Sequence, residues 1–184
     1  MPSWKSANPD GGTNSTMEPP KTALAYPDAL VRRVLDETKT IAMVGASTNW
    51  VRPSNFAMKY LQQKGYRVIP VNPGSAGTEI HGEMCYAALA DIPAGFEMVD
   101  IFRRSEDAGG IVDEAIALKD DKGIKTVWMQ LDVIDEAAAA RAEAADLTVI
   151  MDRCPKIEFG RLNHELAWAG INTGVISSKR PRLR

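Results

Sequence analysis

The sequence has few of the residues that hold small disulfide-bonded or metal-stabilised folds together. It contains only two cysteines, Cys85 and Cys154, and two histidines, His81 and His164, and it has no Cys-x-x-Cys pair. A disulfide scaffold needs more cysteines in a shorter chain, and a zinc site needs its ligands at closer spacing. The sequence therefore predicts two reduced thiols in a cytoplasmic protein, with no metal site.

Long apolar segments and an excess of one charge are also missing. The apolar runs have the length of β-strands, well short of the roughly 20 residues that cross a bilayer, and residues 1–20 lack the apolar segment of a signal peptide. The formal net charge of −2 gives no reason to expect binding to nucleic acid or to a membrane. The basic run Lys179–Arg184 is interpreted as a solvated tail.

The glycines do not form a common nucleotide-binding motif. Gly45 follows the first apolar run, but the Gly-Lys-Ser/Thr element of a Walker loop is absent. No further glycine occurs before Gly65, and Asn72-Pro73 stands where an NAD-binding fold has an acidic residue for the ribose. Both features argue against a dinucleotide of the NAD type.

What the sequence does contain is a regular alternation of strand and helix patterns. Short apolar runs predict β-strands at 40–44, 67–71, 98–102, 126–130 and 147–151. Helical patterns are found at 55–64, 108–119 and 135–145, with a first helix capped by Asp28, a shorter one near 84–90 and a further one after Gly160. Parallel strands need crossover helices. The predicted fold class is α/β, a Rossmann-like parallel sheet of about five strands with helices on both faces.

A single domain accounts for these patterns. Residues 1–24 are rich in Pro, Gly, Ser and Thr and are expected to form a disordered lead. Residues 25–170 form the expected Rossmann-like domain, and residues 171–184 form the basic tail. Apolar residues near the end of this domain, such as Leu166 and Trp168, could pack against a protein partner or, in a homo-oligomer, against a second copy of the chain, and the sequence does not choose between them.

The loop after the first strand is the leading candidate for a ligand site. Ligands of open α/β sheets bind beyond the carboxyl ends of the strands, where the strand order reverses. Gly45 permits a close approach of a ligand to the backbone, and Pro53 suits the first turn of a helix. The free N–H groups of that helix, together with Arg52, favour a phosphate, although an ordinary loop with a surface arginine is the alternative. The candidate residues of this loop are Gly45, Ala46, Ser47, Arg52, Pro53 and Ser54.

The ends of the other strands add polar and aromatic side chains. Phe102 offers a ring for stacking a base, and the two arginines that follow it offer phosphate contacts. The alternative is that Phe102 belongs to the core and that water solvates the arginines. The candidate residues of these strand ends are Val71, Asn72, Pro73, Phe102, Arg103, Arg104 and Gln130.

No group of residues in the sequence has a recognisable catalytic arrangement. Cys154 would need a base beside it to act as a nucleophile, and both histidines are interpreted as structural or exposed. Asp152 and Arg153 are expected to pair with each other or with loops. We therefore predict no catalytic residue.

Several short stretches, taken in their order and spacing, match a known family. They are Ile41–Ser47, Arg52–Ser54, Gly65–Pro73, Ile80–Gly82, Leu89–Pro93, Val99–Arg104, Val127–Gln130, Met151–Cys154, Lys156–Glu158 and Gly160–Leu162. Over about residues 29–162 the chain resembles the small bacterial CoA-binding domain proteins. These are stand-alone relatives of the CoA-binding domain of succinyl-CoA synthetase alpha subunits and NDP-forming acyl-CoA synthetases.

The resemblance implies that CoA lies across the strand ends. It places residues 45–47 and Gln130 near the pantetheine, residues 71–73 on the adenosine side, and Phe102 with Arg103 beside the nucleotide. It implies phosphate contacts for Arg52 and Arg104. Ligase activity is not carried over, because no counterpart of the synthetases' phosphorylated histidine is recognisable.

The leading hypothesis is a protein that binds CoA or an acyl-CoA without a complete catalytic site, so that a binding protein is favoured over an enzyme. One alternative is a Rossmann-type enzyme, either an NAD(P)-dependent oxidoreductase or a CoA-linked transferase. The other is a nucleotide-sensing regulator. The expected partner is a small-molecule CoA ligand, with no membrane or nucleic acid.

Overall fold

The computed structural model describes residues 24–165. Nearly all of the expected N-terminal lead, the whole basic tail, and Leu166 and Trp168 of the expected last helix lie outside these residues. The helices are α1 (Asp28–Glu37), α2 (Pro53–Gln63), α3 (Ser105–Lys122), α4 (Glu136–Ala144) and α5 (Pro155–Leu162), with one 3₁₀ turn at Pro73–Ser75. The strands are β1 (Thr40–Val44), β2 (Arg67–Val71), β3 (Glu79–Ile80), β4 (Glu83–Met84), β5 (Met98–Ile101), β6 (Thr126–Met129) and β7 (Thr148–Ile150).

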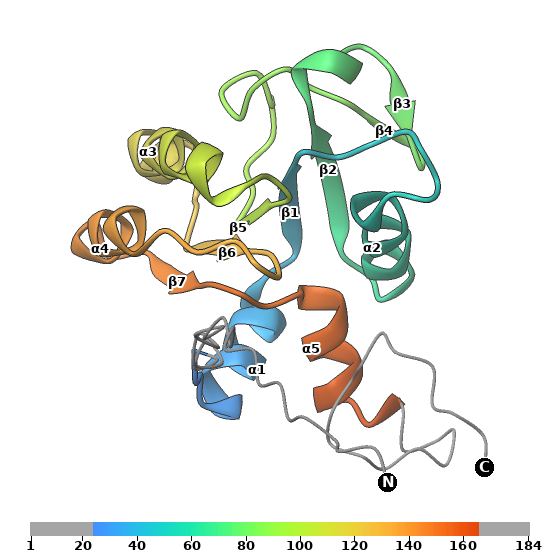
Figure 1. The fold of residues 1–184 in the computed structure, drawn as a ribbon. Helices are drawn as coiled ribbons and strands as arrows, with labels where there is room; N and C mark the ends of the chain where they lie inside the picture. Colours follow the sequence, from blue (N-terminus) through green and yellow to red (C-terminus); the bar gives the residue numbers. More distant parts are fainter. Residues whose placement is uncertain (1–23, 166–184) are drawn as a thin grey trace, which may run out of the picture.

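Five of the strands form one parallel sheet in the order β2-β1-β5-β6-β7 (Figure 1). Helices α3 and α4 cover one face, and α1, α2 and α5 cover the other. The predicted α/β, Rossmann-like fold with helices on both faces is therefore confirmed. Strands β3 and β4 form a separate antiparallel hairpin.

The strands are apolar throughout because both of their faces are buried. Alternate residues of each strand point to opposite faces of the sheet and belong to two separate hydrophobic cores. Val99 packs beneath α3, whereas Met98 packs on the side of α1 and α2. Trp128 of β6 is fully buried on the second side, and its indole N–H donates to the carbonyl oxygen of Arg153 at 2.8 Å. A sheet covered twice in this way leaves its strand ends as the accessible edge.

Two sequence expectations about helices are wrong. The segment near 84–90 is not helical, because it runs beside the edge strand β2, where the backbone of Tyr86 bonds with Pro70 and Asn72 at 3.0 and 2.8 Å. Asp28 does not cap α1 but begins it, and its carboxylate pairs with Arg161 of α5 at 2.7 Å. The ion pair connects the two helices and holds the pKa of Asp28 below its ordinary value.

The strand order reverses between β1 and β5, and this reversal positions the site. Strand β1 has β2 on one side and β5 on the other; the chain passes from β1 through α2 to β2 on one side, whereas from β5 it passes through α3 to β6 on the other side. Beyond the last residues of the two strands, the N–H of Phe102 still donates to the carbonyl oxygen of Val44 at 2.8 Å. The backbones then diverge and leave room for side chains, as expected where strand order reverses.

Candidate functional site

A polar cavity of about 420 Å³ lies at this point of divergence. Helix α2 begins beside it, with Pro53 at the first helical position and no side-chain cap for the N–H groups of the first turn. The lining residues are Gly45, Ser47, Arg52, Pro53, Ser54, Asn72, Phe102 and Arg103. A helix start of this kind carries a partial positive charge, so the cavity favours an anion.

Gly45 allows the β1–α2 loop to turn against the end of β5. Its φ is +88°, and a Cβ at this position would overlap the carbonyl oxygen of Phe102. Only glycine fits such a backbone without strain. The loop therefore packs closely against β5, and Gly45 lines the cavity at the end of β1.

Side-chain hydrogen bonds hold the same loop in place. The amide of Asn72 donates to the carbonyl oxygen of Ala46 at 2.7 Å, and the amide of Asn55 donates to that of Ser47 at 2.8 Å. The ring nitrogen Nε2 of His81 lies 2.8 Å from Oδ1 of Asn55. His81 therefore connects the β3–β4 turn to the start of α2, which is the structural role expected of it. The loop is held in its conformation without a ligand.

Two neighbouring arginines differ in their surroundings. Arg103 lines the polar cavity, and so does Arg52, and within residues 24–165 neither forms an ion pair. Arg104 instead pairs with Glu106 at 3.2 Å and with Asp107 at 3.6 Å in the first turn of α3. Two guanidinium groups are therefore available to an anion in the cavity.

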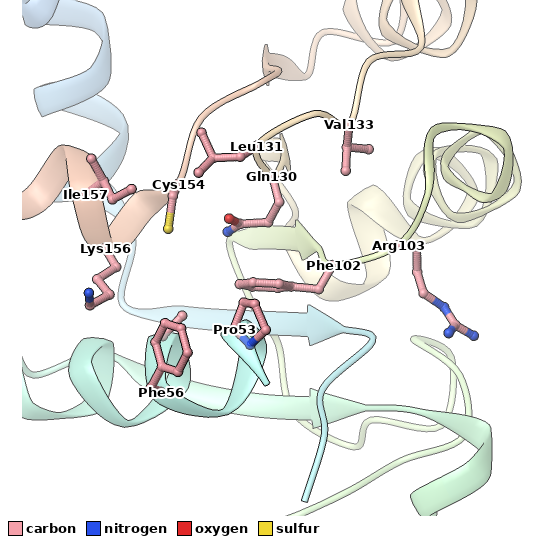
Figure 2. A pocket seen from close by; sticks show the side chains of 11 residues that line it. Pro53, Phe56, Phe102, Arg103, Gln130, Leu131, Val133, Cys154, Lys156 and Ile157 are labelled. Atoms are coloured by element: carbon pink, nitrogen blue, oxygen red, sulfur yellow. The ribbon is translucent and has the colours of Figure 1, made fainter. Parts of the chain in front are cut away.

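An apolar cavity of about 510 Å³ adjoins the polar one (Figure 2). The two cavities share Pro53, Phe102 and Arg103. The other lining residues of the apolar cavity are Phe56, Ala57, Gln130, Leu131, Val133, Cys154, Lys156 and Ile157. They come from α2, from the loop after β6 and from the start of α5, so the cavity lies between the ends of β5 and β6 and these two helices.

Gln130 connects this cavity to a buried carboxylate. Its amide nitrogen donates to Oδ1 of Asp100 at 2.8 Å, while Oδ2 of Asp100 has no hydrogen-bond partner among the described residues. Asp100 is completely buried in β5, and burial raises its pKa to about 7, against a smaller opposing effect of the Gln130 hydrogen bond. Burial therefore favours the protonated form of this carboxyl group compared with an exposed aspartate.

Cys154 directs its sulfur toward the apolar cavity (Figure 2). Burial raises the pKa of its thiol to about 11, although the backbone N–H groups of Ile157 and Lys156 oppose the shift. The thiol is neutral at physiological pH and is a poor nucleophile. No group of three or more His, Cys, Asp or Glu side chains in the described part of the chain could hold a metal ion.

Comparison with known proteins identifies the family of this chain. The model of a CoA binding domain matches residues 39–160. The chain belongs to this family of CoA-binding domains. The Bacillus subtilis (strain 168) protein YneT is 33% identical over 129 residues, which cover 70% of this chain and 91% of YneT.

Solved structures of related proteins show the same fold. A hypothetical protein from Pyrococcus horikoshii OT3 has a TM-score of 0.70 and 37% identity, and the match covers 80% of this CoA-binding domain chain and 99% of that one. The dinucleotide-forming acetyl-coenzyme A synthetase 1 of Ca. Korarchaeum cryptofilum has a TM-score of 0.52 and 23% identity, over 61% of this chain and 25% of the synthetase. At this identity the second likeness concerns the fold alone.

Most of the residues predicted for the site of this CoA-binding domain line the two cavities. Gly45, Ser47, Arg52, Pro53, Ser54, Asn72, Phe102 and Arg103 line the polar one, and Gln130 lines the apolar one. Four of the predicted residues line neither. Val71 is a buried strand residue, Ala46 is buried beneath the loop, Pro73 lies in the exposed 3₁₀ turn, and Arg104 caps α3.

Sequence reasoning missed most of the apolar cavity. Phe56, Leu131 and Ile157 are separated by long stretches of chain, and no local pattern connects them. One signal was readable in advance, because Asp100 is a carboxylate inside an otherwise apolar strand.

Asp152, expected to pair with Arg153 or with loops, accepts from the backbone N–H of Asp132 at 2.9 Å. The described residues contain no helix long and apolar enough to cross a membrane.

Proposed function

We propose that this protein binds coenzyme A across the two cavities. The polar cavity, with Arg52, Arg103 and the start of α2, receives the phosphates of the nucleotide. Asn72 and the ring of Phe102 are then beside the adenosine, and the pantetheine arm passes Phe102 toward Gln130. Membership of the CoA-binding domain family supports this ligand class.

The observation that carries the proposal is that Arg52 and Arg103 line the polar cavity without an ion-pair partner among the described residues. A cavity with two such guanidinium groups beside the positive end of a helix is suited to a polyanion. Gly45 supports it further, because the loop at Gly45 packs closely against the end of β5 and so forms part of the wall of the polar cavity. CoA satisfies both features, since its phosphates are joined to a long arm that can reach the neighbouring cavity.

Calorimetric titration of the purified protein with CoA tests the proposal. Charge-assisted hydrogen bonds contribute roughly 1.5–3 kcal/mol each, so we expect Arg52→Ala and Arg103→Ala each to weaken binding about ten- to a hundredfold. Arg104→Ala is the matched control, because Arg104 adjoins Arg103 in the sequence but pairs with Glu106 outside the cavity. Its affinity for CoA should stay within about twofold of the parent value.

Two results would contradict CoA as the ligand. The first is the absence of binding by the folded protein, and the second is an equal loss of affinity in Arg104→Ala and Arg103→Ala. Titration with NADH and NADPH in the same series tests the oxidoreductase alternative. Binding of either dinucleotide in preference to CoA would favour it.

We infer further that the protein has no complete catalytic site of its own. The support is the chemistry of the cavity walls, where the thiol of Cys154 is held neutral and Asp100 lies behind Gln130. Incubation of the protein with acetyl-CoA and product analysis by mass spectrometry tests this inference. Release of free CoA, lost in Cys154→Ala, would overturn it.

A further inference from the structure

The apolar cavity provides very little polar contact for the ligand that reaches it. Its walls are formed by two aromatic rings, Phe56 and Phe102, and by aliphatic side chains such as Leu131 and Ile157. A volume of about 510 Å³ falls within the range of ligand cavities, roughly 300–1,000 Å³. A cavity of this lining and size favours an apolar group.

Most of the polar groups around the cavity are engaged elsewhere. The amide nitrogen of Gln130 donates to Asp100. The ammonium group of Lys156 lies 5.6 Å from the ring centre of Phe56 and 5.4 Å from that of Tyr60, so the two rings hold it at the side. Arg103 extends away from the centre of the apolar side chains (Figure 2). A pantetheine amide placed deep in this cavity would therefore find few side-chain partners, whereas an alkyl group needs none.

Two exposed apolar side chains at the cavity belong to different elements. Phe56 on α2 is 47% exposed and Leu131 after β6 is 51% exposed, and both line the cavity. Large apolar side chains that gather around one hollow indicate a binding surface more strongly than isolated ones do. Their burial by an alkyl chain would contribute free energy of binding.

The two cavities are connected, so a group in the apolar cavity can be part of the same ligand as an anion in the polar cavity. Pro53, Phe102 and Arg103 line both cavities, so one ligand can occupy the two together. Such a ligand has a polyanionic part at one end and an apolar part at the other. A fatty-acyl thioester of CoA has this construction, whereas free CoA ends in a thiol.

We propose that the apolar cavity holds the acyl chain of an acyl-CoA, so that the physiological ligands are thioesters with apolar chains of short to medium length. This inference rests on the proposed function, since it takes the polar cavity as the nucleotide end of the site. The protein holds the thioester intact. The neutral thiol of Cys154 at the cavity wall fits this role.

The affinity for a series of acyl-CoAs tests the proposal. We would titrate the full chain with CoA, acetyl-CoA, butyryl-CoA, hexanoyl-CoA and succinyl-CoA. Each buried methylene stabilises a complex by about 0.8 kcal/mol, so the dissociation constant should fall about fourfold per methylene until the cavity is filled. Succinyl-CoA should bind more weakly than butyryl-CoA, because its carboxylate would lose its hydration in the cavity.

Variants of Ile157 locate the effect in the cavity. Ile157→Trp narrows the cavity, so the affinity should no longer rise with the length of the acyl chain. Ile157→Ala enlarges the cavity and should move the optimum to longer chains. Ile116→Trp and Ile116→Ala are the matched controls, because Ile116 is also half-buried but lies on α3, which covers the opposite face of the sheet. Both control variants should keep the parent order of affinities.

The outcomes separate this inference from the proposed function. If CoA binds and all acyl-CoAs bind equally well, the acyl inference is wrong and CoA binding stands. Tighter binding of succinyl-CoA than of butyryl-CoA would also overturn it, and would assign Lys156 to a carboxylate. If no CoA compound binds, the proposed function fails and this inference fails with it. The parent protein alone decides between these outcomes, so the test survives a variant that does not fold.

Discussion

The buried carboxylate of Asp100 makes the stability of this protein depend on pH in a way that one substitution should remove. Burial raises the pKa of Asp100 from its ordinary value of 3.8 to about 7. Below about pH 4 the carboxyl group is protonated in the folded and the unfolded chain alike, and it causes no pH dependence. Between about pH 4 and pH 7 the unfolded chain releases this proton first, so the free energy of unfolding decreases as the pH rises.

The size of the effect follows from the difference between the two pKa values. Each pH unit of difference corresponds to 1.36 kcal/mol, so the loss amounts to roughly 4 kcal/mol at and above about pH 7. In Asp100→Asn the titrating group is absent, and the oxygen of the new amide can still accept from Gln130. The amide N–H groups would lack an acceptor, which costs roughly 1–3 kcal/mol at every pH. We therefore expect the variant to be less stable than the parent protein near pH 4–5 and more stable above about pH 7.

Urea unfolding at several pH values between about 4.5 and 9 measures this difference. The difference between variant and parent is the quantity to compare, because other carboxylates titrate equally in both. Asp120→Asn, at an exposed position on α3, is the control, and its difference from the parent should change little with pH. A difference for Asp100→Asn that is independent of pH would refute the reasoning, since Asp100 would then titrate normally in the folded protein.

Three further predictions concern the loop, the thiol and the core. Gly45→Ala should lower the free energy of unfolding in urea by about 2–4 kcal/mol, because Gly45 has a positive φ and a Cβ there would overlap the backbone of Phe102. Gly77→Ala is the control: Gly77 has a similar φ but no near neighbour, so the same measurement should show a loss of only about 1 kcal/mol. The thiol of Cys154 is tested in a Cys85→Ala background, where it should react with Ellman's reagent at pH 8 at least roughly a hundredfold more slowly in the native protein than in urea. The reason is that burial raises its pKa to about 11. Equal rates in the native protein and in urea would contradict this burial. Trp128→Phe should cost about 1–3 kcal/mol in thermal or urea unfolding, because the carbonyl oxygen that accepts from the indole is left without its partner, and a neutral substitution would show that another donor replaces it.

The sheet could be predicted from the sequence because parallel strands covered on both faces must be apolar along their whole length. All five predicted runs are strands of the sheet, with ends that differ by at most a residue or so. Helices α1 to α4 were also found, but α3 begins at Ser105, ahead of the predicted start, because Arg104 and the acidic residues after it form its first turn. Helix α5 was missed, since it begins at Pro155 whereas the sequence predicted a helix only after Gly160. The segment near 84–90 was misjudged because its hydrogen bonds go to β2, which no local pattern reveals.

The candidate site divides in the same way. The polar cavity was predictable because its residues directly follow strands, and the ends of parallel strands meet at one edge of a sheet. Arg103 and Arg104 could not be told apart in the sequence, since their roles depend on how the chain turns from β5 into α3.

By itself the sequence determined the strands, the parallel sheet and the loop at Gly45, since these depend on local hydrophobicity and on backbone conformations that only glycine adopts readily. Only the tertiary structure decided that Phe56, Leu131 and Ile157 surround one apolar cavity, and that Asp100 lies fully buried beneath Gln130. The physical reason is that burial and cavities arise from side chains on separate elements. Their packing depends on how the helices lie against the sheet, which no single stretch of the chain specifies.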